Sequence, residues 1–125
     1  MAGKYLIDTN IAIDYLNNKL PEVAADELDK DTLCISVITR MELLAWRGAN
    51  AEDLNIIEKF IRSAIVHDLE EQIIIKAIEI RKNYSVKLPD AIIAATSLVH
   101  GYTLVTRNVS DFKKIRGIKL LDPWR

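Results

Sequence analysis

The sequence predicts an α/β fold, a three-layer α/β/α domain built on a central, mainly parallel sheet of about five strands. Short apolar runs typical of buried strands alternate along the 125 residues with longer segments of helical period. The segments between these runs can hold helices, which the crossovers of a parallel sheet need. No repeat, low-complexity stretch or linker interrupts the pattern. We therefore expect residues 1–125 to form a single domain.

Five short runs rich in Leu, Ile and Val are expected to be the strands. They lie at residues 4–8, 32–36, 65–68, 102–106 and 118–122. Each is short and apolar, as expected for strands that are covered by helices on both faces.

Three helices are expected in the first half of the chain. Residues 10–18 predict the first, and residues 21–30 the second, with Pro21 in its first turn. The third is expected over residues 37–48, ending at Gly48. Its expected apolar stripe is Ile38, Met41, Leu44 and Ala45.

Four more helical segments follow, at residues 51–64, 69–84, 88–100 and 110–115. The first two are amphipathic, with stripes of Leu54, Ile57 and Ile61 and of Ile73, Ala77, Ile80 and Tyr84. The third is apolar nearly all round, which predicts that it is buried. Pro89 marks its start and Gly101 its end.

Composition excludes several classes of protein. No apolar stretch approaches the roughly 20 residues that span a bilayer, and the first residues do not resemble a signal peptide, so we expect a cytoplasmic protein. The single Cys34 excludes an internal disulfide and reads as a small buried hydrophobe. The net charge is −1, but residues 101–125 carry six Lys or Arg against two Asp. Such a basic segment suits a polyanion or a solvated surface.

Four acidic residues each follow an expected strand or lie near the start of the next helix. They are Asp8, Glu42, Asp90 and Asp111. In an open parallel sheet, sites form beyond the carboxyl ends of the strands. These four side chains could therefore meet at one edge of the sheet.

Each of the four also has a structural explanation. Asp8 could end its strand in an Asx turn, and Glu42 could complete a capping box begun at Thr39. Asp90 could stabilise a helix N-terminus through the helix dipole. Asp111 could supply the return hydrogen bond of a capping box begun at Asn108. As a set they are harder to explain this way, because carboxylates in one cleft repel unless a cation joins them. Mg²⁺ and Mn²⁺ prefer carboxylate ligands.

No other ligand set stands out in the sequence. His67 and His100 are isolated, without a Cys or His at ligand spacing, and are expected to be structural. The four glycines form no phosphate-binding loop. The chemistry that this sequence supports is therefore metal-assisted, with carboxylates and a few hydroxyl or amide groups.

The successive segments LIDTNIAIDYL, ISVITRMELL and LPDAIIAATSLVHGYTLVTRNVSDF resemble the motifs of PIN-domain ribonucleases, particularly the VapC-like toxins. The resemblance implies a PIN-like nuclease domain in which Asp8, Glu42, Asp90 and Asp111 form the acidic site. It implies that Asp8 and Asp90 are direct metal ligands. It also gives supporting polar roles to Thr9, Asn10, Thr106 and Asn108. Asp14, expected to face solvent, and Asp122 stay outside the site.

The same resemblance implies hydrolysis of RNA phosphodiester bonds with Mg²⁺, or alternatively Mn²⁺. Either Glu42 or Asp111 could orient the attacking water. Arg40, Arg107 and Lys113 flank the motifs as RNA contacts. A cognate antitoxin and a second copy of the chain are the implied protein partners, and the helices at 51–64 and 70–84 could supply surface for them.

Three other functions compete with this one. A phosphotransferase built on Asp8 usually wants a second Asp two residues later, where this chain has Asn10. A binding module could keep the fold and act only through its partner. A housekeeping nuclease would work without an antitoxin, and the neighbouring reading frame would distinguish it.

Overall fold

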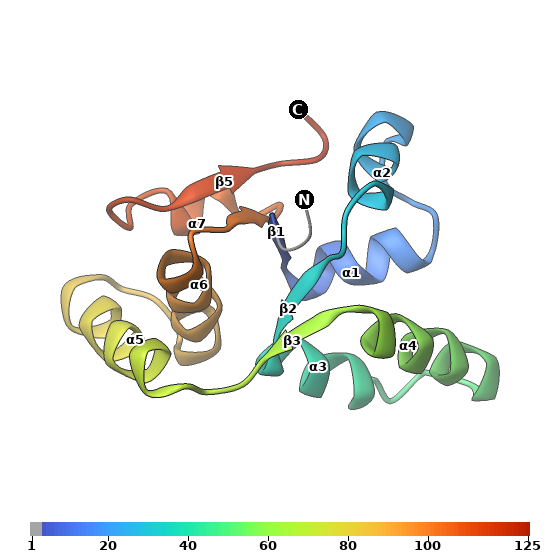
Figure 1. The fold of residues 1–125 in the computed structure, drawn as a ribbon, viewed down its shortest axis with the longest axis horizontal. Coiled ribbons are helices and arrows are strands. Elements are labelled where there is room, and N and C mark those ends of the chain that lie inside the picture. The colour runs from blue at the N-terminus through green and yellow to red at the C-terminus, as the bar shows by residue number, and fades with distance from the viewer. Residues whose placement is uncertain (1–3) are drawn as a thin grey trace.

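The computed structural model describes residues 4–125 and contains one sheet with the strand order β3-β2-β1-β4-β5 (Figure 1). The strands are β1 Tyr5–Ile7, β2 Cys34–Ser36, β3 Ile65–His67, β4 Thr103–Val105 and β5 Lys119–Leu121. Every neighbouring pair is parallel. The predicted parallel sheet is confirmed.

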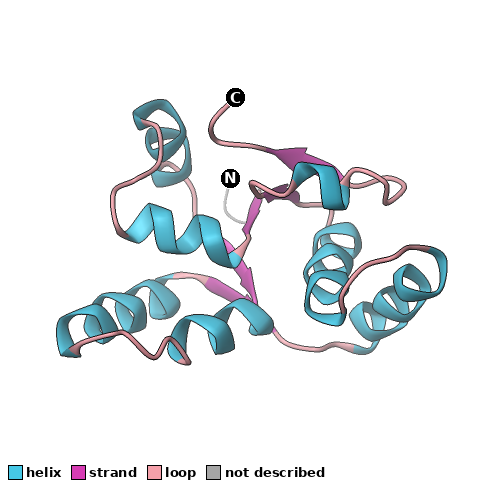
Figure 2. Ribbon diagram, turned by 180° about the vertical axis from the view of Figure 1, so that it is seen from behind, coloured by secondary structure: helices cyan, strands magenta, loops and turns pink. Residues whose placement is uncertain are grey.

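Helices cover both faces of the sheet, as a three-layer domain requires. One layer consists of α1 Thr9–Leu16, α2 Glu22–Asp29, α3 Val37–Leu44 and α4 Ala51–Ser63. The other side carries α5 Glu71–Asn83, α6 Leu88–His100 and the short α7 Val109–Phe112. Figures 1 and 2 show these two groups on opposite sides of the strands.

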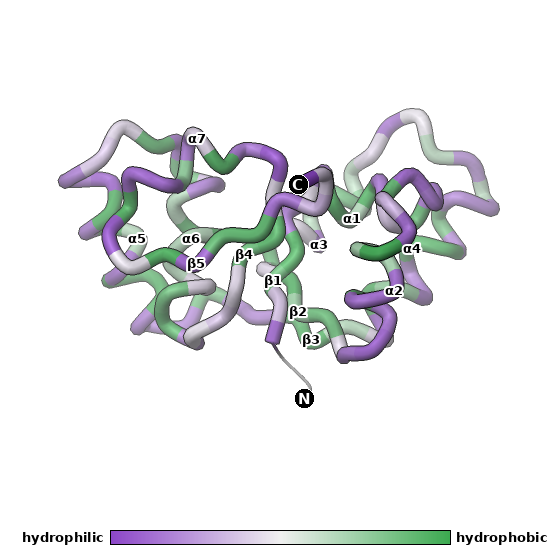
Figure 3. Tube along the Cα trace, turned by 90° about the horizontal axis from the view of Figure 1, so that it is seen from above, coloured by the Kyte–Doolittle hydropathy of each residue, from purple (hydrophilic) through white to green (hydrophobic). Residues whose placement is uncertain are grey.

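The strands divide the interior into two cores, because successive side chains of a strand point to opposite faces. Leu6 joins the core under α5 and α6, which also holds Ile73 and Ile93. Tyr5 and Ile7 join the core under α1 to α4. Figure 3 shows the apolar strands between the two groups of helices, whose outer segments are more polar.

Helix ends follow local signals in the sequence. Asn50 and Asp53 form a reciprocal capping box at the start of α4. Pro89 lies in the first turn of α6, and Gly101 ends that helix in the left-handed conformation with φ 70°. Both boundaries of α6 are therefore as predicted. Pro21 is the N-cap residue of α2 and precedes its first turn, so its predicted place was off by one position.

The predicted stripe and end of the third helix were wrong. α3 ends at Leu44, before Gly48, and its buried side chains are Thr39 and Leu43. Met41 and Leu44 are 58% and 44% exposed. The helix is buried along the other stripe, where Leu43 joins the core under α1 to α4 and the Thr39 hydroxyl lies 3.0 Å from the Thr9 hydroxyl on α1.

The order of the strands places a switch point beside β1. The chain builds β2 and β3 on one side of β1 and then returns to build β4 and β5 on the other. Ligands of open α/β sheets bind at such a switch point, beyond the carboxyl ends of the strands. The residues that follow β1 and β4 therefore lie side by side at this switch point. Within residues 4–125, no helix is long and apolar enough to cross a membrane.

Candidate active site

Asp8 stands at the switch point, directly after β1, as the N-cap residue of α1. Its side chain is only 6% exposed. Oδ1 accepts the backbone N–H of Thr9 at 2.8 Å, and Oδ2 accepts the hydroxyl of Thr106 at 2.9 Å. Thr106 directly follows β4, the strand that pairs with β1. Asp8 therefore caps α1 through the adjacent N–H of Thr9 and does not close the suggested Asx turn, which would use the N–H two residues on. The same carboxylate is also held from the neighbouring strand.

Glu42 reaches the same region from α3, the helix that follows β2. Its Oε1 accepts the hydroxyl of Thr9 at 2.6 Å. The suggested capping box from Thr39 to Glu42 is wrong, because Ser36 is the N-cap residue of α3 and accepts the N–H of Ile38. Glu42 has no capping role here and is instead oriented towards α1.

Asp90 and Asp111 line a cavity of about 640 Å³. Asp90 is half-buried in the first turn of α6, and Asp111 is exposed on α7. The suggested box between Asn108 and Asp111 is also wrong, because the Asn108 side chain makes no capping hydrogen bond. The backbone N–H of Asn108 donates to the Thr106 hydroxyl oxygen at 3.0 Å instead.

The pKa values of Asp8 and Asp90 are raised by burial and by neighbouring carboxylates. Burial raises the pKa of Asp8, the hydrogen bonds from Thr106 and Thr9 oppose this, and Asp90 and Glu42 raise it further. Burial also raises the pKa of Asp90, and Glu42 and then Asp111 add to the rise, while Lys87 lowers it. Since charges must be close to shift a pKa, Asp8 and Asp90 both lie near Glu42 and near each other, and Asp111 lies near Asp90.

The donor set of this cluster suits a hard cation. Among the described residues, no salt bridge includes Asp8, Glu42, Asp90 or Asp111. Repelling carboxylates that have hydroxyl neighbours and lack a bonded cationic side chain offer the oxygen ligands that Mg²⁺ and Mn²⁺ prefer. Burial is the main cause of the raised pKa values of Asp8 and Asp90, and a divalent ion would remove the repulsion that adds to it.

Three of the four supporting polar residues lie at the acidic residues or the cavity, and the fourth, Asn10, does not. Thr9 and Thr106 hydrogen-bond the carboxylates, and Asn108 lines the cavity with Asp90 and Asp111. Asn10 is exposed on α1. The expectation that Asp14 faces solvent is wrong, because its side chain is only 17% exposed and pairs with Arg107 at 3.4 Å.

The predicted RNA contacts have different surroundings. The Cζ of Arg107 lies 4.0 Å from the centre of the Trp124 ring, and the side chain also forms an ion pair with Asp14. Arg40 is half-buried on α3, and Lys113 is exposed just after α7.

Sequence reasoning missed three residues that line the cavity beside Asp90. They are Arg81, Tyr84 and Lys87. The position of Lys87, three residues before Asp90, was the available signal for one of them.

A second correction concerns the two histidines. The sequence treated His67 and His100 as isolated, but their rings lie 4.1 Å apart between centroids. They come together because α6 returns the chain to the edge strand β3.

Comparisons with known proteins find relatives of similar sequence. The sequence profile of the PIN domain matches residues 5–118. The tRNA(fMet)-specific endonuclease VapC of Salmonella typhimurium is 33% identical over 129 aligned residues, which cover 95% of this chain and 97% of the relative.

Solved structures are similar as well. DNA-bound VapBC from Salmonella typhimurium superposes with a TM-score of 0.82 at 32% identity, over 98% of both chains. A toxin–antitoxin complex from Klebsiella pneumoniae gives a TM-score of 0.73 at 29% identity, over 96% of this chain and 98% of that one. The similarity therefore extends over the whole described fold.

Proposed function

The chain belongs to the PIN domain family, among the VapC ribonucleases, and we propose that its acidic cluster is the active site of an RNA-cleaving hydrolase. One observation carries this assignment. Asp8 is buried at the switch point, held by Thr106, with Asp90 and Glu42 close enough to raise its pKa. A fold does not usually bury a carboxylate among other carboxylates unless a cation or a reaction requires it.

Asp8 and Asp90 are the proposed ligands of Mg²⁺, with Mn²⁺ as the alternative ion. Asp8 supplies a carboxylate fixed by two hydrogen bonds, and Asp90 a carboxylate from the first turn of a largely buried helix. A divalent cation bound there would neutralise charge that develops on the scissile phosphate and make water a better nucleophile.

Either Glu42 or Asp111 is the proposed group that orients the attacking water. Glu42 is restrained by the Thr9 hydroxyl, whereas Asp111 is exposed beside the cavity. A carboxylate on either side of the phosphate can accept the proton of the water as it attacks in line. Such a reaction leaves a 5′ phosphate and a 3′ hydroxyl and needs no participation by the RNA 2′-OH.

The cavity beside Asp90 is the proposed path of the RNA strand. Arg81 and Lys87 place positive charge along it, and Tyr84 offers an aromatic ring on its wall. Cationic side chains contact phosphates, and aromatic rings can stack on unpaired bases. Lys113, Arg40 and Arg107 are proposed as further contacts at the edges of the site. Initiator tRNA is the first substrate to test, because a similar protein is a tRNA(fMet)-specific endonuclease.

The chain is the toxin of a toxin–antitoxin pair, with a cognate antitoxin as its partner, as in the similar VapBC complexes. We further propose a homodimer that acts in the cytoplasm, where its RNA would be found. Exposed apolar side chains on α4 and α5, namely Ile56, Ile75 and Ile78, support the use of these helices as partner surface. An antitoxin-like reading frame beside the gene would argue against a housekeeping nuclease.

The decisive experiment compares cleavage of end-labelled tRNA(fMet) and unstructured RNA by the antitoxin-free protein and its Asp90→Asn variant. Asp26→Asn is the matched control, because Asp26 is exposed on α2. We expect cleavage in Mg²⁺ or Mn²⁺ by the wild-type protein and by Asp26→Asn, and none in EDTA.

Asp90→Asn should lose at least two orders of magnitude in rate, the scale of one lost electrostatic group in an active site. Undiminished cleavage by a folded Asp90→Asn protein would remove Asp90 from the site. The absence of cleavage by every protein would favour the binding module instead.

A further inference from the structure

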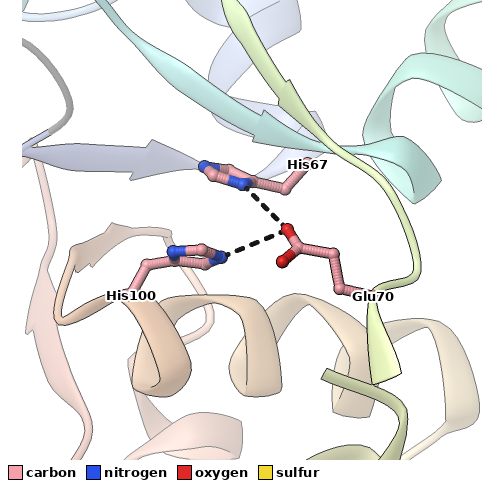
Figure 4. A group of neighbouring side chains, drawn as sticks. All are labelled: His67, Glu70 and His100. Atoms are coloured by element: carbon pink, nitrogen blue, oxygen red, sulfur yellow. Dashed lines mark ion pairs between the residues drawn. The ribbon is translucent and has the colours of Figure 1, made fainter. Parts of the chain in front are cut away.

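A second group of chemically active side chains lies away from the acidic cluster. His67 is the last residue of β3, Glu70 is the N-cap residue of α5, and His100 is the last residue of α6. Figure 4 shows the two imidazole rings one above the other, tilted by 31°, with a nitrogen of each turned towards the same carboxylate oxygen of Glu70. Three separate elements thus present ligand-forming groups to one point.

The distances in this group suit a shared ion better than direct hydrogen bonds. His67 Nδ1 and His100 Nε2 lie 3.7 and 3.5 Å from Oε1 of Glu70. A hydrogen bond between imidazolium and carboxylate is about 2.7–2.9 Å long. Ligands at about 2.0–2.1 Å from a tetrahedral zinc ion lie about 3.3 Å from each other. All three ligand atoms are within 4.8 Å of one another, so small side-chain movements would complete the geometry.

The surrounding residues prepare the two imidazoles as ligands. The Nε2 of His67 hydrogen-bonds the Tyr102 hydroxyl at 2.7 Å, which leaves Nδ1 for a metal and fixes the ring. The Nε2 of His100 is buried and has no hydrogen-bond partner among residues 4–125.

We propose that His67, Glu70 and His100 form a binding site for a zinc-class transition-metal ion, separate from the acidic site. Two imidazoles and one carboxylate favour such an ion over Mg²⁺, which prefers oxygen ligands. Water fills the fourth position, and the half-exposed Glu70 side chain leaves a path for the ion.

The two sites are at opposite ends of one helix. Asp90 lies in the first turn of α6 and His100 is its last residue, and the helix of 13 residues is about 20 Å long. Because its ligands come from β3, α5 and α6, the bound ion ties the edge strand to the helical layer and stabilises the fold.

Zinc titration by calorimetry tests this site, using untagged protein with Asp90→Asn and excess Mg²⁺ to suppress binding at the acidic site. We expect one Zn²⁺ per chain and a rise in the melting temperature. Glu70→Gln in the same background should weaken Zn²⁺ binding at least tenfold and remove most of that rise. Its matched control is Glu71→Gln, an adjacent exposed residue of α5, which should bind as the parent does.

A second readout identifies the ligands. Co²⁺ bound in place of Zn²⁺ should give the strong visible absorption of a four-coordinate imidazole site, and Glu70→Gln or His100→Gln should abolish it. Equal Zn²⁺ affinity in the Glu70→Gln and Glu71→Gln proteins would overturn the proposal. So would the absence of any binding, which would leave a histidine pair facing a carboxylate. Neither readout involves RNA cleavage, so this proposal and the nuclease function succeed or fail independently.

Discussion

Thr106 donates its hydroxyl hydrogen bond to Oδ2 of Asp8 at 2.9 Å, although the two residues are 98 positions apart in the sequence. The bond exists because β1 and β4 are parallel neighbours and each residue directly follows its strand. The backbone N–H of Asn108 donates to the same hydroxyl oxygen, which leaves the Thr106 proton for Asp8. Strand pairing therefore positions the carboxylate on which the proposed site depends.

Thr106→Val tests this positioning with a side chain of the same shape. Thr106 is fully buried, so the variant removes a hydrogen bond to a charged group that water cannot replace. We expect the free energy of unfolding at neutral pH to fall by about 1.5–3 kcal/mol. The pKa of Asp8 should rise further, because this hydrogen bond now lowers it. The acid side of the pH–rate profile for RNA cleavage should move to higher pH.

Thr103→Val is the control for that variant. Thr103 lies on the same strand, and no described hydrogen bond involves its side chain. Its unfolding free energy should stay within about 0.5 kcal/mol of wild type. If Thr106→Val matched Thr103→Val in both stability and pH profile, Thr106 would have no role in holding Asp8.

Asp90→Asn should stabilise the metal-free protein at neutral pH. Burial, Glu42 and Asp111 raise the pKa of Asp90 above its ordinary value of 3.8. A carboxyl group whose pKa is higher in the folded state contributes stability at low pH and loses it as pH rises through that folded pKa. The variant cannot ionise there, so its melting temperature in EDTA should exceed that of wild type at pH 7.

Thermal melts from pH 3.5 to 8 measure this difference, which should shrink as pH falls towards 3.8. Mg²⁺ should then raise the melting temperature of the wild type more than that of Asp90→Asn. If Asp90→Asn were less stable than wild type at pH 7 in EDTA, the ionised Asp90 would not destabilise the folded protein.

Features set by local chemistry were predictable from the sequence. Pro89 and Gly101 bound α6 correctly, because a proline in the first turn and a left-handed glycine act through their own backbone. The four acidic residues were selected because Asp8 directly follows β1 and the other three lie in the helices α3, α6 and α7. The polar partners of those residues were harder, since Thr106 meets Asp8 only through strand pairing.

Features that depend on distant partners escaped the sequence reading. The period of α3 allows two overlapping stripes, and Thr39 is buried because Thr9 approaches it from another helix. His67 and His100 looked isolated because no spacing rule joins residues that meet through a folded pair of helices. Hydrophobic periodicity locates a helix better than it selects the face that is buried.

The inward face of α5 gives a direct test of the fold. Ile73 on α5 is fully buried, whereas Ile75 on the same helix is 57% exposed. Ile73→Ala should lower the free energy of unfolding by about 2–5 kcal/mol, through lost burial and a residual cavity. Ile75→Ala should change it by about 0.5 kcal/mol or less. Urea denaturation of both variants measures the contrast. Similar losses of unfolding free energy would mean that the buried face of α5 is assigned incorrectly.

Lys87 is expected to bind the RNA backbone. It is the exposed N-cap residue of α6, lines the cavity beside Asp90 and lowers the pKa of that residue. Because a phosphate contact releases a counterion, Lys87→Met should reduce the slope of log affinity against log salt by about 0.7 for single-stranded RNA. RNA binding would be measured in the Asp8→Asn background, where the RNA stays intact. Lys59→Met, on the exposed face of α4, is the control and should leave the slope unchanged. Equal slopes for the two variants would move the RNA path away from this cavity.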